Sequence, residues 1–207
     1  MDTLLYNRSN GQNGPGGLFV EHALSICLGL GLAAAAGFRI FVPLLVMSVA
    51  VYTGHLELGQ GFRWIGTLPA LVAFSTATFL EIGAYYIPWL DNLLDSVSGP
   101  SAVVAGSVIA ASTFTEMDPL LKWSLAIIGG GGLAGIVKGT TTIARGTSTA
   151  MTGGLANWML SSFEAGASLL LSTFAILLPL ATMVVVVFLA YVAAKRIFGW
   201  LGRGQEV

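Results

Sequence analysis

Four ionisable residues lie inside apolar stretches of the sequence, where they could take part in chemistry: Arg39, Glu81, Lys138 and Arg145. An ionisable side chain in the interior of a membrane costs about 2.5 kcal/mol or more, so each needs a partner or a water-filled cavity. Counted from the same ends of their apolar stretches, Arg39 and Glu81 reach similar depths, roughly 21 and 24 Å at 1.5 Å per residue. We therefore predict an ion pair between Arg39 and Glu81 near the middle of a helix bundle.

Three roles for these two residues are compatible with the sequence. The pair could fix two helices together, or it could line a substrate path in which Glu81 carries a proton. In the third case Glu81 is protonated and unpaired. Either charge alone in a low dielectric would be far more costly than the pair.

A hydroxyl-rich stretch follows Lys138 and surrounds Arg145. Residues 140–152 contain these hydroxyl side chains: Thr140, Thr141, Thr142, Thr147, Ser148, Thr149 and Thr152. Lipid would reject such a face, so we expect it to point inward. If this segment is broken like the first apolar stretch, half-helix N-termini beside hydroxyls and two cations would make an anion site. The alternative is a cytoplasmic loop with ordinary positive charges. With Asn157 as a bridge between helices, the candidate substrate path consists of Arg39, Glu81, Lys138, Arg145, Ser148, Thr152 and Asn157.

Asp91 and Asp95 form a separate acidic pair, spaced i and i+4 on one helical face at the predicted membrane border. Paired acids can hold Mg²⁺ and, through it, a pyrophosphate, as in membrane prenyl-transfer enzymes. Those enzymes need a second acidic cluster, and the sequence has none. We therefore interpret the pair as a solvated helix end, with no catalytic residue and no metal site.

Other metal and cofactor chemistry finds little support in the sequence. The histidines are His22 and His55, and Cys27 is the single cysteine. They form no cluster with metal-ligand spacing, and a bis-histidine haem on one helix is excluded. We expect no cofactor, and we interpret Cys27 as a small buried apolar residue.

The composition predicts an integral membrane protein. Of 207 residues, 55% are hydrophobic and only 9% are charged, whereas a soluble globule needs roughly 25% charged residues. The net charge of −1 gives no basic field for nucleic acid. A spanning helix takes about 20 apolar residues, so we predict an all-α, polytopic membrane helix bundle of about six spans at 20–53, 65–90, 101–117, 119–138, 140–162 and 166–198.

Two parts of the chain differ in character. Residues 1–18 are polar and rich in glycine, which predicts a flexible N-terminal tail. Residues 19–207 are expected to form a single transmembrane domain. Its first apolar stretch is too long for a bilayer core of about 30 Å, and we expect it to break into two half-helices between Gly37 and Pro43.

An internal repeat is suggested by a short glycine-rich segment. Gly29-Leu30-Gly31-Leu32-Ala33 recurs as Gly130-Gly131-Gly132-Leu133-Ala134, about half the chain later. This predicts pseudo-repeats at about 20–117 and 119–200, and three spans per half would make the halves inverted, as in many transporters. The alternative is that small residues recur wherever membrane helices pack closely.

The positive residues predict an orientation. Arg8, Lys138, Arg145, Lys195, Arg196 and Arg203 fall on one side of a six-span topology, against Arg63 and Lys122 on the other. This places both termini in the cytoplasm, with the protein in a bacterial inner membrane.

Three separated motifs resemble a known family. They are Gly31 to Pro43 (GLAAAAGFRIFVP), the stretch from Glu81 to Asp95 with Ile87-Pro88, and Lys138 through Arg145 with Ser148, Thr152-Gly153-Gly154, Asn157, Ser161 and Glu164. Over about residues 24–198 the sequence resembles a bacterial family of small membrane proteins described only as a domain of unknown function. The resemblance implies a compact multi-helix membrane fold and no established activity. The polar N-terminal tail is longer than the family pattern.

We therefore predict a transporter or channel for a small, anionic solute, and not an enzyme. Its expected partners are membrane lipids and the solute, with a homo-oligomer or a larger membrane complex as a further expectation. The main alternative is a structural or accessory subunit of a larger complex that binds lipid or pigment. An enzyme acting on a lipid phosphate through Asp91 and Asp95 comes third. A water-filled cavity that reaches Arg39 and Glu81 would favour transport, and a closed bundle would favour the subunit.

Overall fold

The computed structural model describes residues 15–84, 87–115, 117–153 and 156–203. Within these ranges every regular element is helical, which confirms the all-α prediction. The elements in chain order are α2 (Pro15–Phe38), α3 (Phe41–Tyr52), the 3₁₀ helix η1 (Gln60–Gly66), α4 (Leu68–Ala84), α5 (Pro88–Thr113), α6 (Pro119–Leu125), the π-helical segment η2 (Ala126–Gly131), α7 (Gly132–Thr152), α8 (Asn157–Leu177) and α9 (Pro179–Arg203).

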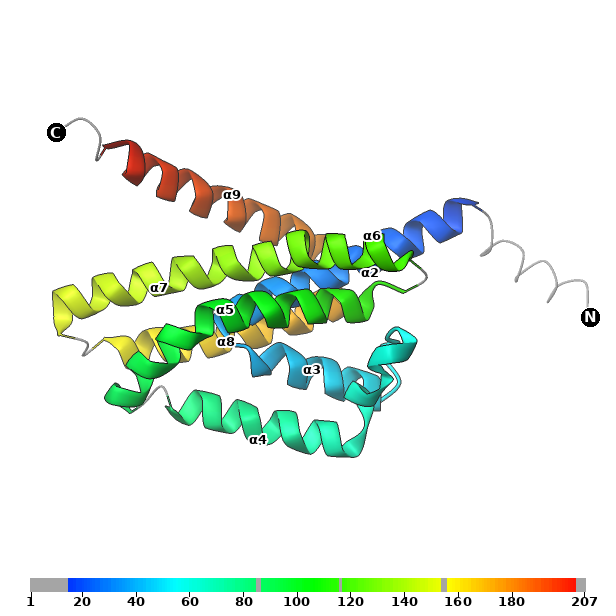
Figure 1. The fold of residues 1–207 in the computed structure, drawn as a ribbon, viewed down its shortest axis with the longest axis horizontal. Coiled ribbons are helices and arrows are strands. Elements are labelled where there is room, and N and C mark those ends of the chain that lie inside the picture. The colour runs from blue at the N-terminus through cyan, green and yellow to red at the C-terminus, as the bar shows by residue number, and fades with distance from the viewer. Residues whose placement is uncertain (1–14, 85–86, 116, 154–155, 204–207) are drawn as a thin grey trace, which may run out of the picture.

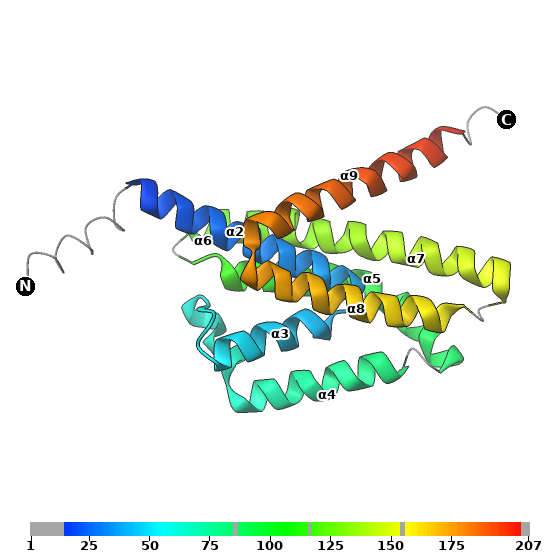
Figure 2. The ribbon, with the colours of Figure 1, turned by 180° about the vertical axis from the view of Figure 1, so that it is seen from behind.

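The helices lie roughly along one axis, and the chain reverses direction between successive helices except along α6, η2 and α7, which run the same way (Figures 1 and 2). α2 begins at one end of this axis and runs into the interior, and α3 returns toward the end where α2 began. Leu32 and Ala36 of α2 share a buried cluster with Met47 of α3, as expected for two helices that run back along each other. α2 and α3 therefore form a helical hairpin. We call residues 39–40 its tip.

The break that makes this hairpin was predicted. α2 ends at Phe38 and α3 begins at Phe41, so Arg39 and Ile40 lie outside both helices. Pro43 stands in the first turn of α3, where its missing N–H would have had no helical acceptor in any case. The predicted break between Gly37 and Pro43 is confirmed, but its products are not two half-helices: α2 is a helix of 24 residues, and α3 turns back along it (Figure 1).

The breaks predicted further along the chain were wrong. Residues Pro119–Thr152 form one continuous helix of 34 residues, with no break between 138 and 140. The threonine hydroxyls are satisfied within it: the Thr140 Oγ1 donates to the Ile136 carbonyl at 2.9 Å, and the Thr147 Oγ1 donates to the Ile143 carbonyl at 3.0 Å. A hydroxyl that bonds its own helix does not need to interrupt it.

The last two predicted spans, 140–162 and 166–198, also have the wrong boundaries. α8 ends at Leu177 and α9 begins at Pro179, so the chain breaks where 166–198 was expected to be one helix. A proline at the start of a helix is tolerated, but one inside it removes a hydrogen bond and clashes with the preceding turn. Pro179 thus separates α8 from α9.

About six membrane spans were predicted from the sequence. Among the residues that the structure describes, three helices are long and apolar enough to cross a membrane: Phe19–Phe38, Pro119–Thr152 and Asn157–Leu177. A fourth follows if η1 and α4, bent by 66°, count as one span. Three shorter apolar helices accompany them, at Phe41–Tyr52, Val97–Thr113 and Pro179–Val192. The chain is polytopic by length and composition, and its large outward apolar side chains, such as Phe79 at 78% exposed, suit a lipid environment.

The two glycine-rich segments lie side by side in α2 and α7. A Cβ built on Gly129, just before the second segment, would lie 2.9 Å from Leu30, and one on Gly37 would lie 2.6 Å from both the Ala134 carbonyl oxygen and the Val137 Cβ. Residue numbers rise together along both helices, so α2 and α7 run in the same direction. Inverted halves would place these segments antiparallel, so the predicted inversion is wrong for this pair. The close approach itself requires small residues.

Candidate functional site

The charged residues gather around Glu164 of α8. The Arg145 Nε donates to Glu164 Oε1 at 3.0 Å, and the Arg145 Nη2 donates to Oε2 at 2.5 Å. The Arg39 Nη2 lies 3.5 Å from the same Oε2 and donates to the Ser161 carbonyl at 3.0 Å and to the Ser161 hydroxyl. One carboxylate is thus held between two guanidinium groups, one of them in the bidentate geometry that arginine favours.

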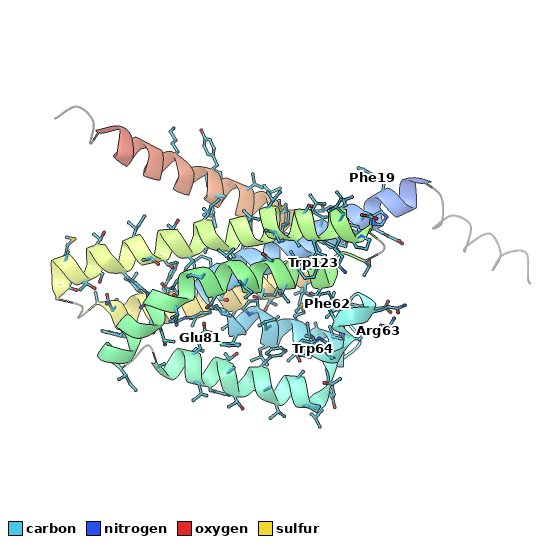
Figure 3. The ribbon with its side chains drawn as sticks, viewed as in Figure 1. Phe19, Phe62, Arg63, Trp64, Glu81 and Trp123 are labelled. Carbon is cyan, nitrogen blue, oxygen red and sulfur yellow. The ribbon has the colours of Figure 1, made fainter. Side chains whose placement is uncertain are left out.

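Glu81 is held by the tip of the hairpin. Its Oε1 accepts a hydrogen bond from the Ile40 N–H at 2.8 Å, and its Oε2 accepts one from the Phe41 N–H at 3.1 Å. These donors stand at the N-terminus of α3, where backbone N–H groups have no helical acceptor and the helix dipole favours a negative charge. Glu81 therefore links α4 to the hairpin, and Arg39 and Lys138 act on its carboxylate electrostatically. Figure 3 shows Glu81 between the helices, well away from Arg63 and Trp64.

The predicted ion pair of Arg39 with Glu81 is corrected by this geometry. In the described part of the chain, Arg39 makes its ion pair with Glu164. Counting residues along two helices predicted the depth of the side chains, but not their direction. Because the chain reverses at Arg39, this side chain leaves the hairpin toward α8.

We define the ionic cluster as five residues: Arg39, Glu81, Lys138, Arg145 and Glu164. Four of them are sealed from solvent, with 1% of Arg39, 4% of Lys138, 3% of Arg145 and 2% of Glu164 exposed. Three members are cations and two are carboxylates. The cluster joins the hairpin tip, α4, α7 and α8.

The other predicted path residues lie at or near the connection between α7 and α8. The Thr152 hydroxyl donates to the Ser148 carbonyl at 2.8 Å, and the Asn157 Nδ2 donates to the Thr149 hydroxyl at 3.1 Å. Ser148 and Asn157 are half-buried, whereas Thr152 is exposed. The structure thus brings Arg39, Glu81, Lys138 and Arg145 together and leaves Ser148, Thr152 and Asn157 beyond them.

The hydroxyl-rich stretch as a whole does not point inward. Thr141 is buried, but most of its neighbours are exposed, namely Thr140, Thr142, Thr147, Thr149 and Thr152. Their outward position is tolerable in an apolar medium because hydroxyls such as those of Thr140, Thr147 and Thr152 donate to carbonyls one turn earlier. The prediction of an inward hydroxyl face is therefore wrong.

The predicted acidic pair falls on residues that the structure describes only in part. Asp91 and Asp95 belong to helix α5, but their side chains lie outside the described set.

Sequence reasoning missed a polar stripe on α8. Ser161, Ser168 and Ser172 are all buried and, with Glu164, they recur at intervals of three and four residues, so they share one helical face. We call the three serines the α8 serine stripe. The Ser168 Oγ donates across to the Ala35 carbonyl of α2 at 3.0 Å. The sequence did contain a signal for this polar face. Glu164 is the only ionisable residue in α8, and a lone charge in an apolar helix needs a polar partner.

Two cavities lie outside the cluster. The end cavity, about 610 Å³, opens where α2 begins, and its wall includes Ile176 and Pro179, just beyond the α8 serine stripe. An apolar groove of about 880 Å³ runs between α7 and α9 and includes Ala34 and Phe38 of α2. Neither cavity has Arg39 or Glu81 in its wall.

The sequence matches the model of one protein family. The family model described as "Domain of unknown function (DUF4126)" matches residues 26–197. The chain belongs to this family. No curated protein and no solved structure matches the sequence. The DUF4126 match spans all five residues of the ionic cluster and the whole α8 serine stripe, so both are parts of the family domain, while the polar N-terminal residues lie outside it.

Proposed function

We propose that this DUF4126 protein is a membrane transporter or channel for a small anionic solute, and not an enzyme. The observation that supports it most is the tip of the α2–α3 hairpin, which lies among buried cations. Broken helices whose ends meet buried charges are typical of transporter binding sites. Ionisable residues inside a membrane commonly mark a substrate or ion pathway.

The sign of the charge supports an anion. The ionic cluster contains three cations, Arg39, Lys138 and Arg145, and two carboxylates, Glu81 and Glu164. A bound oxyanion would accept charge-assisted hydrogen bonds from these cations. Oxyanions such as phosphate, sulfate or a small carboxylate suit guanidinium groups, which donate in a planar fork.

The α8 serine stripe supports a route to the cluster. It leads from Ser161, beside Arg39, toward the residues that line the end cavity. In the present conformation the stripe is packed against α2, and the Ser168 hydroxyl is engaged by the Ala35 carbonyl. Transport would need the hairpin to move away from α8, as in alternating access between packed helices.

Flux through liposomes tests this proposal. The full chain is reconstituted, and release of phosphate, sulfate and small carboxylates is measured. We expect flux of at least one anion above protein-free liposomes, and loss of that flux in Arg39→Gln. Lys195→Gln removes an exposed cation of α9 and is the matched control, with flux like the wild type. Thermal unfolding of each variant, and retained flux in Arg39→Lys, separate loss of transport from loss of folding.

A structural or accessory subunit is the second candidate. It is supported by the sealed state of the cluster and by the apolar α7–α9 groove, which suits a hydrocarbon chain or a neighbouring helix. Folded protein that moves no anion in liposomes would reject the transporter in favour of this role. Equal flux in wild type and Arg39→Gln would also reject the cluster as the path.

We also propose a cell-membrane location with a revised topology. α2 begins at one end of the long axis and α9 ends at the opposite end (Figure 1). If this axis follows the bilayer normal, the two helix ends reach opposite faces. This replaces the expectation that both termini are cytoplasmic, which depended on six crossings.

A further inference from the structure

We infer that the end cavity binds the phosphate headgroup of an anionic amphiphile, with Arg63 and Lys122 as its cationic ligands. This site lies at the end of the molecule where α2 begins. It shares no residue with the ionic cluster. The proposed transport route leads toward this cavity, but binding of a headgroup here does not require transport and goes beyond it.

The charges of the cavity favour an anion. Its charged lining residues, among those that the structure describes, are Glu57, Arg63 and Lys122. In the same part of the chain, the ion pairs are those of Arg39 and Arg145 with Glu164, so neither Arg63 nor Lys122 has a carboxylate partner there. The Lys122 Nζ lies 5.2 Å from the centre of the Phe62 ring. A cation on an aromatic face keeps N–H groups that can donate to a phosphate.

The wall of the cavity is formed by ordered backbone. The Gly59 N–H donates to the Ser112 carbonyl at 3.0 Å and ties the loop before η1 to the end of α5. Leu58 is buried beside it, with 5% exposed. A Cβ at position 59 would lie 3.2 Å from the Lys122 Nζ, so glycine leaves room for this ammonium at the cavity. The cation is therefore positioned before a ligand arrives.

Apolar walls favour an amphiphile over a free ion. Leu24, Leu28 and Ile176 line the same cavity as the two cations. Trp64 and Trp123 stand at this end of the molecule, near Arg63 (Figure 3), and both are more than two-fifths exposed. Tryptophans settle at the level of lipid headgroups. Arg63 and Lys122 would thus meet a headgroup phosphate, and the leucines would meet the hydrocarbon below it.

Thermal unfolding of the purified full chain in neutral detergent tests this site. The additives are phosphatidylglycerol, phosphatidylcholine with the same acyl chains, and inorganic phosphate. We expect phosphatidylglycerol to raise the Tm more than phosphatidylcholine does, and inorganic phosphate to have little effect. The Arg63→Gln/Lys122→Gln double variant should need about tenfold more phosphatidylglycerol for the same shift, since charge-assisted hydrogen bonds are lost.

Two further variants serve as controls for this test. Lys195→Gln removes an exposed cation at the other end of the molecule and should respond like the wild type. The charge-keeping variant Arg63→Lys/Lys122→Arg should retain most of the shift even where the neutral variant is unstable. An equal shift with both lipids, or an unchanged shift in the neutral variant, would overturn the site. A shift by inorganic phosphate alone that is lost in the neutral variant would replace the amphiphile by a free phosphate.

Discussion

Glu164 is the residue on which the ionic cluster depends. Its carboxylate lies within ion-pair distance of both Arg39 and Arg145. Removing one partner of a buried ion pair leaves an uncompensated charge, which typically costs about 3–5 kcal/mol. Glu81 acts differently, because its carboxylate receives two backbone N–H groups of the hairpin tip. The two carboxylates should therefore respond differently when Arg39 is changed.

Two double-mutant cycles that share Arg39→Gln test this difference. In the first it is combined with Glu164→Gln, and in the second with Glu81→Gln, and the free energy of unfolding is measured in detergent for every variant. We expect a coupling of about 1–3 kcal/mol in the first cycle and a smaller one in the second, since only groups in direct contact couple strongly. A larger coupling with Glu81 would restore the pairing that the sequence suggested and contradict this geometry.

At the scale of elements, glycines decide how closely the helices approach. Gly37 faces Ala134 and Val137 of α7, and Gly106 of α5 faces Gly130 of η2. In each case a Cβ would come within 2.8 Å of a backbone oxygen, closer than packed atoms allow. These contacts pack α7 against α2 and η2 against α5.

Alanine substitutions at two helical glycines test the contact between α2 and α7. Gly37→Ala should destabilise the fold by about 1–3 kcal/mol, because the added methyl group overpacks the α2–α7 interface. Gly139→Ala is the matched control in α7, where a Cβ would meet nothing within 4 Å, and it should be neutral or stabilising by up to about 1 kcal/mol through helix propensity. Thermal unfolding in detergent compares the two. Equal effects would show that the helices are not packed as described.

At the scale of the whole molecule, the α2–α3 hairpin sets the topology. α3 turns back toward the end where α2 began. The first apolar stretch therefore contributes two helices that run in opposite directions, where the sequence predicted one span. The start of α2 and the end of α9 consequently lie at opposite ends (Figure 1). The end cavity and the C-terminal end of α9 are likewise on different sides of the molecule.

Cysteine labelling tests this topology. Cys27 is the single cysteine, so Cys27→Ser gives a background into which Glu21→Cys or Lys195→Cys is introduced, at exposed positions of α2 and α9. In right-side-out membrane vesicles, a membrane-impermeant maleimide should label only one of the two positions. Permeabilised vesicles, in which both should react, provide the control. Labelling of both positions, or of neither, in sealed vesicles would contradict the opposite placement.

The sequence by itself predicted a helical membrane protein and the place of the break between α2 and α3. An apolar composition with few charges excludes a soluble surface, and Gly37 and Pro43 interrupt helical hydrogen bonding locally, so neither conclusion needs knowledge of distant contacts. Arg39, Glu81, Lys138 and Arg145 were also identified as expensive charges on composition alone. At residues 138–140 no proline interrupts the helix, and the helix ends predicted there were wrong.

Only the tertiary structure decided which charges meet. Arg39 and Ser161 are separated by 122 positions in the sequence, and their hydrogen bond depends on the direction in which the hairpin leaves α2. The parallel course of α2 and α7 and the sealed state of the cluster likewise follow from contacts between remote helices. Hydropathy and spacing report how deep a residue lies along its own helix, whereas the partner that it faces is set by how the helices pack around one another.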